Sequence, residues 1–127
     1  MESVVEKLQR IGLTEYEAKA YLSLLTNHVN SAAKLSEKSG VPRTKIYQVL
    51  ESLERKGWIR IYSGIPLLFK AVDPGDVFEK IKKNYGEFLQ SIQATLDREV
   101  MEMKEKFVIL KFDVGLRSLK EEMRKAK

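Results

Sequence analysis

The chain has 127 residues, of which 43% are hydrophobic, and a formal net charge of +5. This is enough apolar material for one small core with an extension, but not for two independent domains. There is no cysteine, which excludes disulfides and thiolate metal sites. Because neither a signal peptide nor a membrane-length apolar run is present, we expect a soluble, cytoplasmic protein with no membrane contact.

Short helices are predicted in the first thirty residues. Apolar residues recur at helical spacing over residues 4–11, and Gly12 would end that helix. A capping box begins the next one, since Thr14 can cap the helix while Glu17 binds the backbone N–H of the cap. We expect this second helix to end near Asn27.

The segment from Ser31 to Leu53 predicts a helix-turn-helix. Ser31 can cap a short helix that ends at Gly40, which takes the left-handed conformation readily. Pro42 is suited to the first turn of the following helix. The inner face of that helix is marked by apolar residues three and four positions apart, namely Ile46, Val49, Leu50 and Leu53.

Side chains that can bind DNA occupy the outer side of this second helix. Arg and Lys donate to guanine O6 and N7, Gln pairs with adenine, and Thr contacts a thymine methyl or a phosphate. We predict that four residues read bases, namely Arg43, Thr44, Lys45 and Gln48. Ser31, Tyr47 and Ser52 are expected on the DNA backbone. The alternative is an ordinary solvated helix face, since these residue types are common on surfaces.

A β-hairpin is predicted after Gly57, which is expected to end the helix. Residues 58–62 and 67–72 are rich in aromatic and β-branched residues, and the Ser-Gly-Ile-Pro stretch between them supplies turn residues. A hairpin that follows a DNA-reading helix is the wing of a winged helix. Its candidate DNA contacts are Arg60, Tyr62 and Lys70, although the hairpin can also serve only to close the core.

Asp73 and Pro74 are typical of a helix start, as cap and first residue. The helix that follows carries an apolar seam at spacings of three and four, with one stutter. We call these residues the first seam: Tyr85, Phe88, Ile92, Leu96, Val100, Met103 and Phe107. Such a seam favours pairing with the same helix of a second copy, and the alternative is that it folds back on its own domain.

The pattern changes at residues 107–115, where apolar residues lie on all sides and Gly115 interrupts them. Helical spacing resumes at Leu116, Leu119 and Met123 in a very charged tail. The sequence leaves open whether the long helix ends here or continues.

Charge and residue types also limit the function. Residues 31–60 hold seven basic and three acidic residues, so most of the positive charge falls on the predicted DNA-reading segment. His28, expected in a loop, is the only histidine, which excludes Ser-His, Cys-His and His-rich zinc sites within one chain. There is no glycine-rich phosphate loop. We therefore predict no enzyme, no metal and no cofactor.

Four segments resemble the N-terminal part of the archaeal TrmB-type transcriptional regulators. They are residues 13–22 (LTEYEAKAYL), 39–47 (SGVPRTKIY), 53–59 (LERKGWI) and 64–74 (GIPLLFKAVDP). The resemblance implies a winged helix-turn-helix that dimerises on operator DNA. Longer members continue into a sugar-recognising domain, which these residues do not include, so sugar sensing is not expected here. Residues 27–30 depart from the small or Gly-containing turn usual in the family.

Together these features predict a mainly α protein with a small β-hairpin. Residues 1–75 would form a winged helix-turn-helix, and residues 76–127 a helical extension that forms a coiled-coil dimer. We expect a sequence-specific regulator that binds double-stranded DNA as a homodimer, with any effector or protein partner left open. The alternatives are a winged helix that binds other proteins, and an architectural protein that binds DNA without sequence preference.

Overall fold

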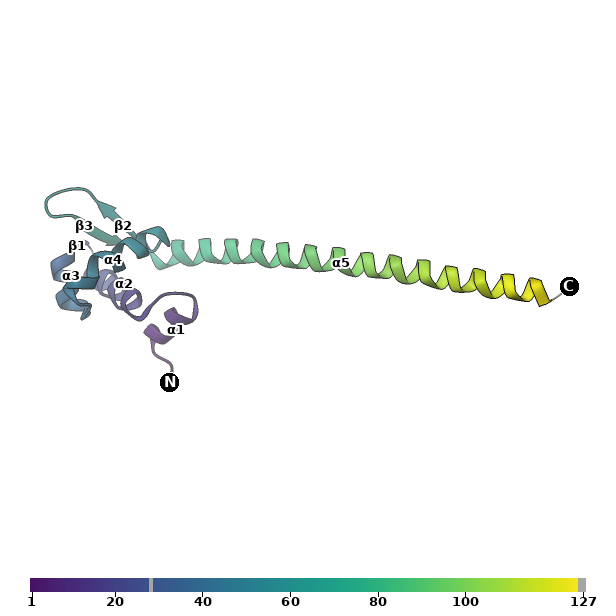
Figure 1. The fold of residues 1–127 in the computed structure, drawn as a ribbon. Coiled ribbons are helices and arrows are strands. Elements are labelled where there is room, and N and C mark those ends of the chain that lie inside the picture. The colour runs from purple at the N-terminus through teal and green to yellow at the C-terminus, as the bar shows by residue number, and fades with distance from the viewer. Residues whose placement is uncertain (28, 126–127) are drawn as a thin grey trace. The chain divides into compact units, whose positions relative to one another are not determined.

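The computed structural model of the protein describes residues 1–27 and 29–125 (Figure 1). His28, expected in a loop, lies outside the described residues. The chain divides into two units, Met1–Ile81 and Lys82–Lys127. The elements follow in the order α1 (Val4–Arg10), α2 (Glu15–Asn27), β1 (Val29–Ser31), α3 (Ala32–Ser39), α4 (Arg43–Arg55), β2 (Ile59–Tyr62), β3 (Leu68–Ala71) and α5 (Pro74–Lys125). The predicted mainly α winged helix-turn-helix with a long C-terminal helix is confirmed.

The helix starts follow the predicted capping chemistry. The Glu17 backbone N–H donates to Thr14 Oγ1 at 3.1 Å, and the Thr14 N–H donates to Glu17 Oε1 at 2.8 Å. At the start of α5, the Asp73 carboxylate accepts from the Gly75 N–H at 2.9 Å, and Pro74 is the first helical residue. Both predicted starts are confirmed.

Helix α5 continues through the stretch where the sequence pattern breaks. It runs to Lys125 and includes Gly115 in its interior. A glycine costs a helix about 1 kcal/mol relative to alanine, which is too little to end a helix with good helix formers on both sides. Exposed apolar residues on all sides do not stop a helix either, because the backbone hydrogen bonds do not depend on them.

The sheet has a third strand that the sequence analysis missed. The strand order is β1-β3-β2, with both neighbours of β3 antiparallel to it. Strand β1 is only three residues long, and its Asn30 and Ser31 are polar, so no apolar alternation marks it. It pairs Asn30 with Phe69 and leads directly into α3.

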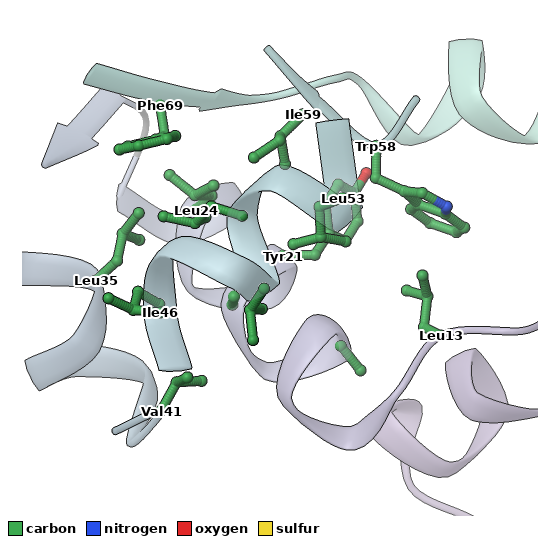
Figure 2. Close-up of a cluster of buried hydrophobic side chains, with 14 of the residues drawn as sticks. Leu13, Tyr21, Leu24, Leu35, Val41, Ile46, Leu53, Trp58, Ile59 and Phe69 are labelled. Carbon is green, nitrogen blue, oxygen red and sulfur yellow. The ribbon is translucent and has the colours of Figure 1, made fainter. Parts of the chain in front are cut away.

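A single core joins the helices and the sheet of the first unit. Figure 2 shows Ile59 and Phe69 of the sheet above Leu24 of α2 and Leu53 of α4. Apolar residues from α1, α3 and the start of α5 also belong to this core, among them Leu8, Leu35 and Val77. The inner face of α4 is therefore held against both the helices and the sheet.

Tyr21 contributes both an apolar ring and a polar anchor to this core. Its ring lies edge-on to the Trp58 ring, with centroids 5.0 Å apart, and its hydroxyl donates to the Val72 carbonyl at 2.8 Å. Burial, with a smaller effect from the Asp73 carboxylate, raises the pKa of Tyr21 to about 12. The phenol therefore stays protonated as a donor and ties α2 to the chain between β3 and α5.

The Glu17 carboxylate joins the start of α2 to the end of α4. Only 2% of Glu17 is exposed. Its carboxylate accepts from the Ser52 hydroxyl at 2.8 Å and from Lys56 Nζ at 2.8 Å, and Lys56 also donates to the Gly12 carbonyl at 3.1 Å. The prediction that Ser52 points outward is wrong, because its hydroxyl is drawn inward by this carboxylate.

These contacts keep Glu17 ionised. Burial alone would raise the pKa of Glu17, but hydrogen bonds from Lys56, the Thr14 backbone and Ser52, together with the Lys56 charge, outweigh burial and hold the pKa below its usual value. A carboxyl group with a lowered pKa in the folded state stabilises the fold above its unfolded-state pKa. That contribution is lost as the pH falls through the folded-state pKa.

We therefore expect Glu17→Gln to lower the free energy of unfolding by about 1 to 3 kcal/mol at neutral pH, because it removes the charge of a buried carboxylate that pairs with Lys56 and one of the oxygens that accept from Lys56 and Ser52. The loss should shrink as the pH falls through the lowered pKa of Glu17, where the native carboxyl also becomes protonated. Denaturant unfolding at several pH values measures both effects.

Glu15→Gln is the matched control. Glu15 pairs with Lys19 at 3.0 Å on the same helix, but the Glu15 side chain is 59% exposed, whereas that of Glu17 is 3% exposed. An exposed pair contributes at most about 1 kcal/mol, so this variant should stay close to the unaltered chain. Equal losses in the two variants would contradict a special role for Glu17.

Candidate nucleic-acid interface

The turn between α3 and α4 is held by the chain's own hydrogen bonds. Gly40 has φ +79°, and its N–H donates to the Ser36 carbonyl at 3.1 Å. The Ser36 hydroxyl donates to the Val41 carbonyl, and the Val41 N–H donates to Ser39 Oγ at 3.2 Å. Because Val41 itself is buried, the turn is fixed relative to the core.

Helix α4 begins one residue later than the position of Pro42 suggested. Pro42 is the cap, with φ −57°, and its carbonyl accepts the first helical hydrogen bond from the Ile46 N–H at 3.0 Å. The predicted inner face is confirmed, since the buried residues of the helix are Ile46, Val49, Leu50 and Leu53. Their burial determines which side chains of α4 face away from the core.

All four residues predicted to read bases are exposed on α4. Arg43, Thr44, Lys45 and Gln48 lie outside the buried face, and Tyr47 beside them is 58% exposed. The three ion pairs found among the described residues involve none of these side chains. Their donors are thus available for a partner.

The outer face of α4 is larger than the sequence analysis proposed. Glu51 and Arg55 are also exposed, and they continue the line of Thr44 and Gln48 at spacings of three and four residues. Helical spacing alone could have identified them. Ser31, expected near DNA, is half-buried, and its side chain caps α3 by accepting from the Lys34 N–H at 3.4 Å.

The basic residues of the hairpin lie on the outer face of the sheet. Arg60 and Lys70 are opposite each other in the β2–β3 register, and Tyr62 is opposite Leu68. All four are exposed. Arg60, Tyr62 and Lys70 line a hollow that is also lined by the carboxylate-bearing residues Asp73 and Asp76. This places the predicted wing cations at the base of the hairpin, beside the start of α5.

The tip of the hairpin is apolar rather than basic. Residues 63–67 contain no charged side chain, and Ile65 is fully exposed, with Leu67 and Leu68 partly exposed next to it. The sequence predicts only a turn in this stretch. Its exposed apolar residues form a surface that suits contact with another protein better than contact with phosphates.

The second unit is the part of α5 that carries the first seam. Every residue of the first seam is exposed, from 40% for Ile92 to 72% for Met103. Tyr85 and Phe88 contact each other within the helix, with ring centroids 6.5 Å apart. An apolar stripe of this length in water is a surface that favours association.

No helix in the part of the chain that the structure describes is long and apolar enough to cross a membrane. No group of three or more His, Asp or Glu side chains in those residues could hold a metal ion.

Comparison with known proteins identifies the first unit. The family described as "Sugar-specific transcriptional regulator TrmB" matches residues 8–75. The sugar-sensing transcriptional regulator TrmBL1 of Pyrococcus furiosus is 46% identical over 83 residues, which cover 65% of this chain and 24% of that protein. The DNA-binding transcriptional repressor TrmBL2 of Thermococcus kodakarensis is 36% identical over 87 residues, which cover 68% of this chain and 33% of the repressor.

A solved structure of TrmBL2, described as an archaeal chromatin protein with a novel mode of DNA binding, matches with a TM-score of 0.71 at 33% identity. The match covers 80% of this chain and 41% of that one. The chain spans about a quarter to a third of the length of the curated relatives above.

The relatives are transcriptional regulators rather than enzymes, which confirms the prediction of a non-enzymatic protein. The family match covers the helix-turn-helix, the hairpin and the start of α5. The chain belongs to the TrmB family of DNA-binding transcriptional regulators.

Proposed function

We propose that the chain is a sequence-specific, double-stranded DNA-binding regulator that acts as a homodimer. Residues 1–75 would bind the DNA, and residues 76–127 would pair two copies. The observation that carries this proposal is the exposed outer face of α4, which presents Arg43, Thr44, Lys45 and Gln48 on a helix whose inner face is fully engaged.

The chemistry of this face suits the major groove. Arg43 and Lys45 can donate to guanine, Gln48 can make a bidentate pair with adenine, and Thr44 can contact a thymine methyl or a phosphate. Tyr47 would reach the sugar-phosphate backbone. The rigid turn before α4 supports base reading, because a helix held in one orientation loses little freedom on binding.

The first seam supports the homodimer. Burying a large apolar side chain contributes roughly 1.5 to 3 kcal/mol, so pairing two seams would remove a large unfavourable exposure. Two recognition helices would then meet successive major grooves about 34 to 36 Å apart, or a multiple of that distance. Selection of bound sequences from a random DNA pool tests this proposal, and enrichment of a two-fold symmetric site is the expected outcome.

A protein-binding role is the second candidate, and the apolar hairpin tip favours it. Exposed apolar patches mark surfaces for protein association more often than for phosphate contact. A pool with no enriched sequence but tight, salt-dependent binding would instead indicate an architectural protein. If the chain retains no DNA from the pool, the result would favour the protein-binding role.

On the selected site, Arg43→Ala or Gln48→Ala should weaken binding by roughly 1 to 3 kcal/mol, because each removes a contact to a base edge. Binding to random DNA should change little. Gln9→Ala, at an exposed position of α1, is the matched control and should bind as the unaltered chain. Titrations with the selected site and with random DNA measure the two affinities. An equal loss of affinity for both would contradict base reading.

Replacing Arg60 or Lys70 with Ala tests the hairpin. If these side chains contact phosphates, affinity falls on all sequences and the slope of log K against log salt decreases by about one. Lys7→Ala, at an exposed position of α1, is the control for the loss of one positive charge. A slope equal to that of the control would place Arg60 and Lys70 outside the interface, as their position beside Asp73 and Asp76 allows.

Replacing Ile92 and Leu96 together with Lys should give a monomer, because paired seams would bring the added charges together in an apolar interface. The winged helix should stay folded, but binding to the two-fold site should fall toward that of a single half-site. Sedimentation measures the mass and titration the affinity. Gln90→Lys with Ala94→Lys is the matched control, since it adds the same charges at the same spacing on the opposite side of α5.

A further inference from the structure

The distal part of α5 carries a second apolar surface that the first seam does not include. We call it the second face, and its residues are Met101, Val108, Ile109, Phe112, Leu116, Leu119 and Met123. They are between 40% and 66% exposed. Because α5 is one continuous helix to Lys125, their positions around its axis follow from helical geometry.

At about 100° per residue, the second face and the first seam lie on opposite sides of the helix. In this stretch the first seam is continued by Leu110 and Val114. The second face has no counterpart before Met101, because the same side of α5 there carries polar residues, among them Lys83, Glu87 and Gln90. A pairing of two first seams therefore leaves the second face of each copy exposed.

Charged residues separate the two apolar surfaces. One strip between them carries Glu102, Lys106, Asp113, Arg117, Lys120 and Arg124, and the other carries Lys104, Lys111 and Glu122. A solvated helix needs only one apolar side, so two opposed apolar sides with charged borders indicate a helix with a neighbour on each.

We propose that the second face packs antiparallel against the second face of another copy, centred on Phe112. Five of its seven residues are spaced symmetrically about that position, and Ile109 falls opposite Gly115. With Phe112 opposite its own copy, Met101 meets Met123 and Val108 meets Leu116. In an antiparallel two-fold pair, apolar residues meet apolar residues only where their spacing is symmetric in this way. Glu105, the one charged residue within the face, lies opposite Leu119 and next to Lys120 of the second copy.

The flanking charges include attractive pairs in this register. In an antiparallel pair each border faces the same border of the partner helix. One border then brings Glu102 near Lys120 of the second copy, and the other brings Lys104 near Glu122 of the second copy. Both contacts occur twice by symmetry and are attractive, whereas the same register also brings Asp113 near Asp113 and Lys111 near Lys111 of the second copy.

Because the two surfaces are on opposite sides of the helix, the second interface adds copies without closing a ring. Particle mass should therefore rise with concentration beyond that of a dimer. Contact between two second faces does not depend on DNA binding, but growth beyond a dimer rests on the first-seam pairing proposed above; a disulfide crosslink tests the second face alone.

The orientation is tested by disulfide formation, because the chain contains no cysteine of its own. Val108→Cys and Leu116→Cys are prepared separately, mixed and oxidised, and a disulfide between the two variants is expected. Val108→Cys alone should not crosslink, because an antiparallel pair places its two copies of residue 108 about 12 Å apart along the axis. Crosslinking of Val108→Cys with itself would overturn the antiparallel arrangement.

The interface itself is tested by sedimentation over a range of concentrations. Phe112→Gln with Leu119→Gln should hold the mass at that of a dimer, with the helix content by circular dichroism and the binding to the two-fold site unchanged. Lys106→Gln with Asp113→Gln is the matched control, since it has the same spacing, leaves net charge unaltered and lies on a charged strip. It should assemble as the unaltered chain does.

An unaltered chain that never exceeds a dimer, together with no disulfide between Val108→Cys and Leu116→Cys, would overturn the proposal and leave the second face to another occupant. Assembly that persists in the Phe112→Gln, Leu119→Gln variant would overturn it as well. Loss of dimers together with loss of DNA binding in that variant would show that the two apolar surfaces are not separate, which also contradicts the proposal.

Discussion

The burial of one side of α4 is the constraint on which the rest of the structure depends. Ile46, Leu50 and Leu53 are almost completely buried between the other helices and the sheet. Rotating α4 by even one residue, about 100°, would bring polar residues into that core and expose leucines, at a cost of several kcal/mol. The outward direction of Arg43 and Gln48 is thus a consequence of packing rather than of any contact that these side chains make themselves.

Glu17 and the turn at Gly40 fix the two ends of the same helix. The turn holds the buried Val41, two residues before α4 begins, through Ser36 and Ser39. At the other end, the Glu17 carboxylate holds Ser52 and Lys56. A helix held at both ends can present a surface in one orientation, which is the condition for reading bases rather than only phosphates.

The elements that were predicted correctly from the sequence are those with local signals. The capping box at Thr14, the left-handed Gly40 and the three- and four-residue spacing in α4 each depend on residues within one turn or helix. Strand β1 was missed because its pairing with β3 is a long-range contact between residues with no strand pattern. Ser52 was misplaced for a similar reason, since its partner Glu17 lies 35 residues earlier. The position of Arg60 and Lys70 beside Asp73 and Asp76 likewise depends on how the hairpin meets α5.

At Met101, α5 changes from a helix with one apolar side to a helix with two, and the two parts suit different contacts. Before Met101 the helix has one apolar side, which suits a pair that holds two recognition helices at a set spacing. Beyond it a second apolar side appears, which suits contacts between such pairs. If pairs are joined, each DNA-bound pair raises the local concentration of the next one, so that weak individual sites can be occupied together. Specificity would then depend on α4 and the spacing within a pair, while occupancy over longer stretches of DNA would depend on the distal helix.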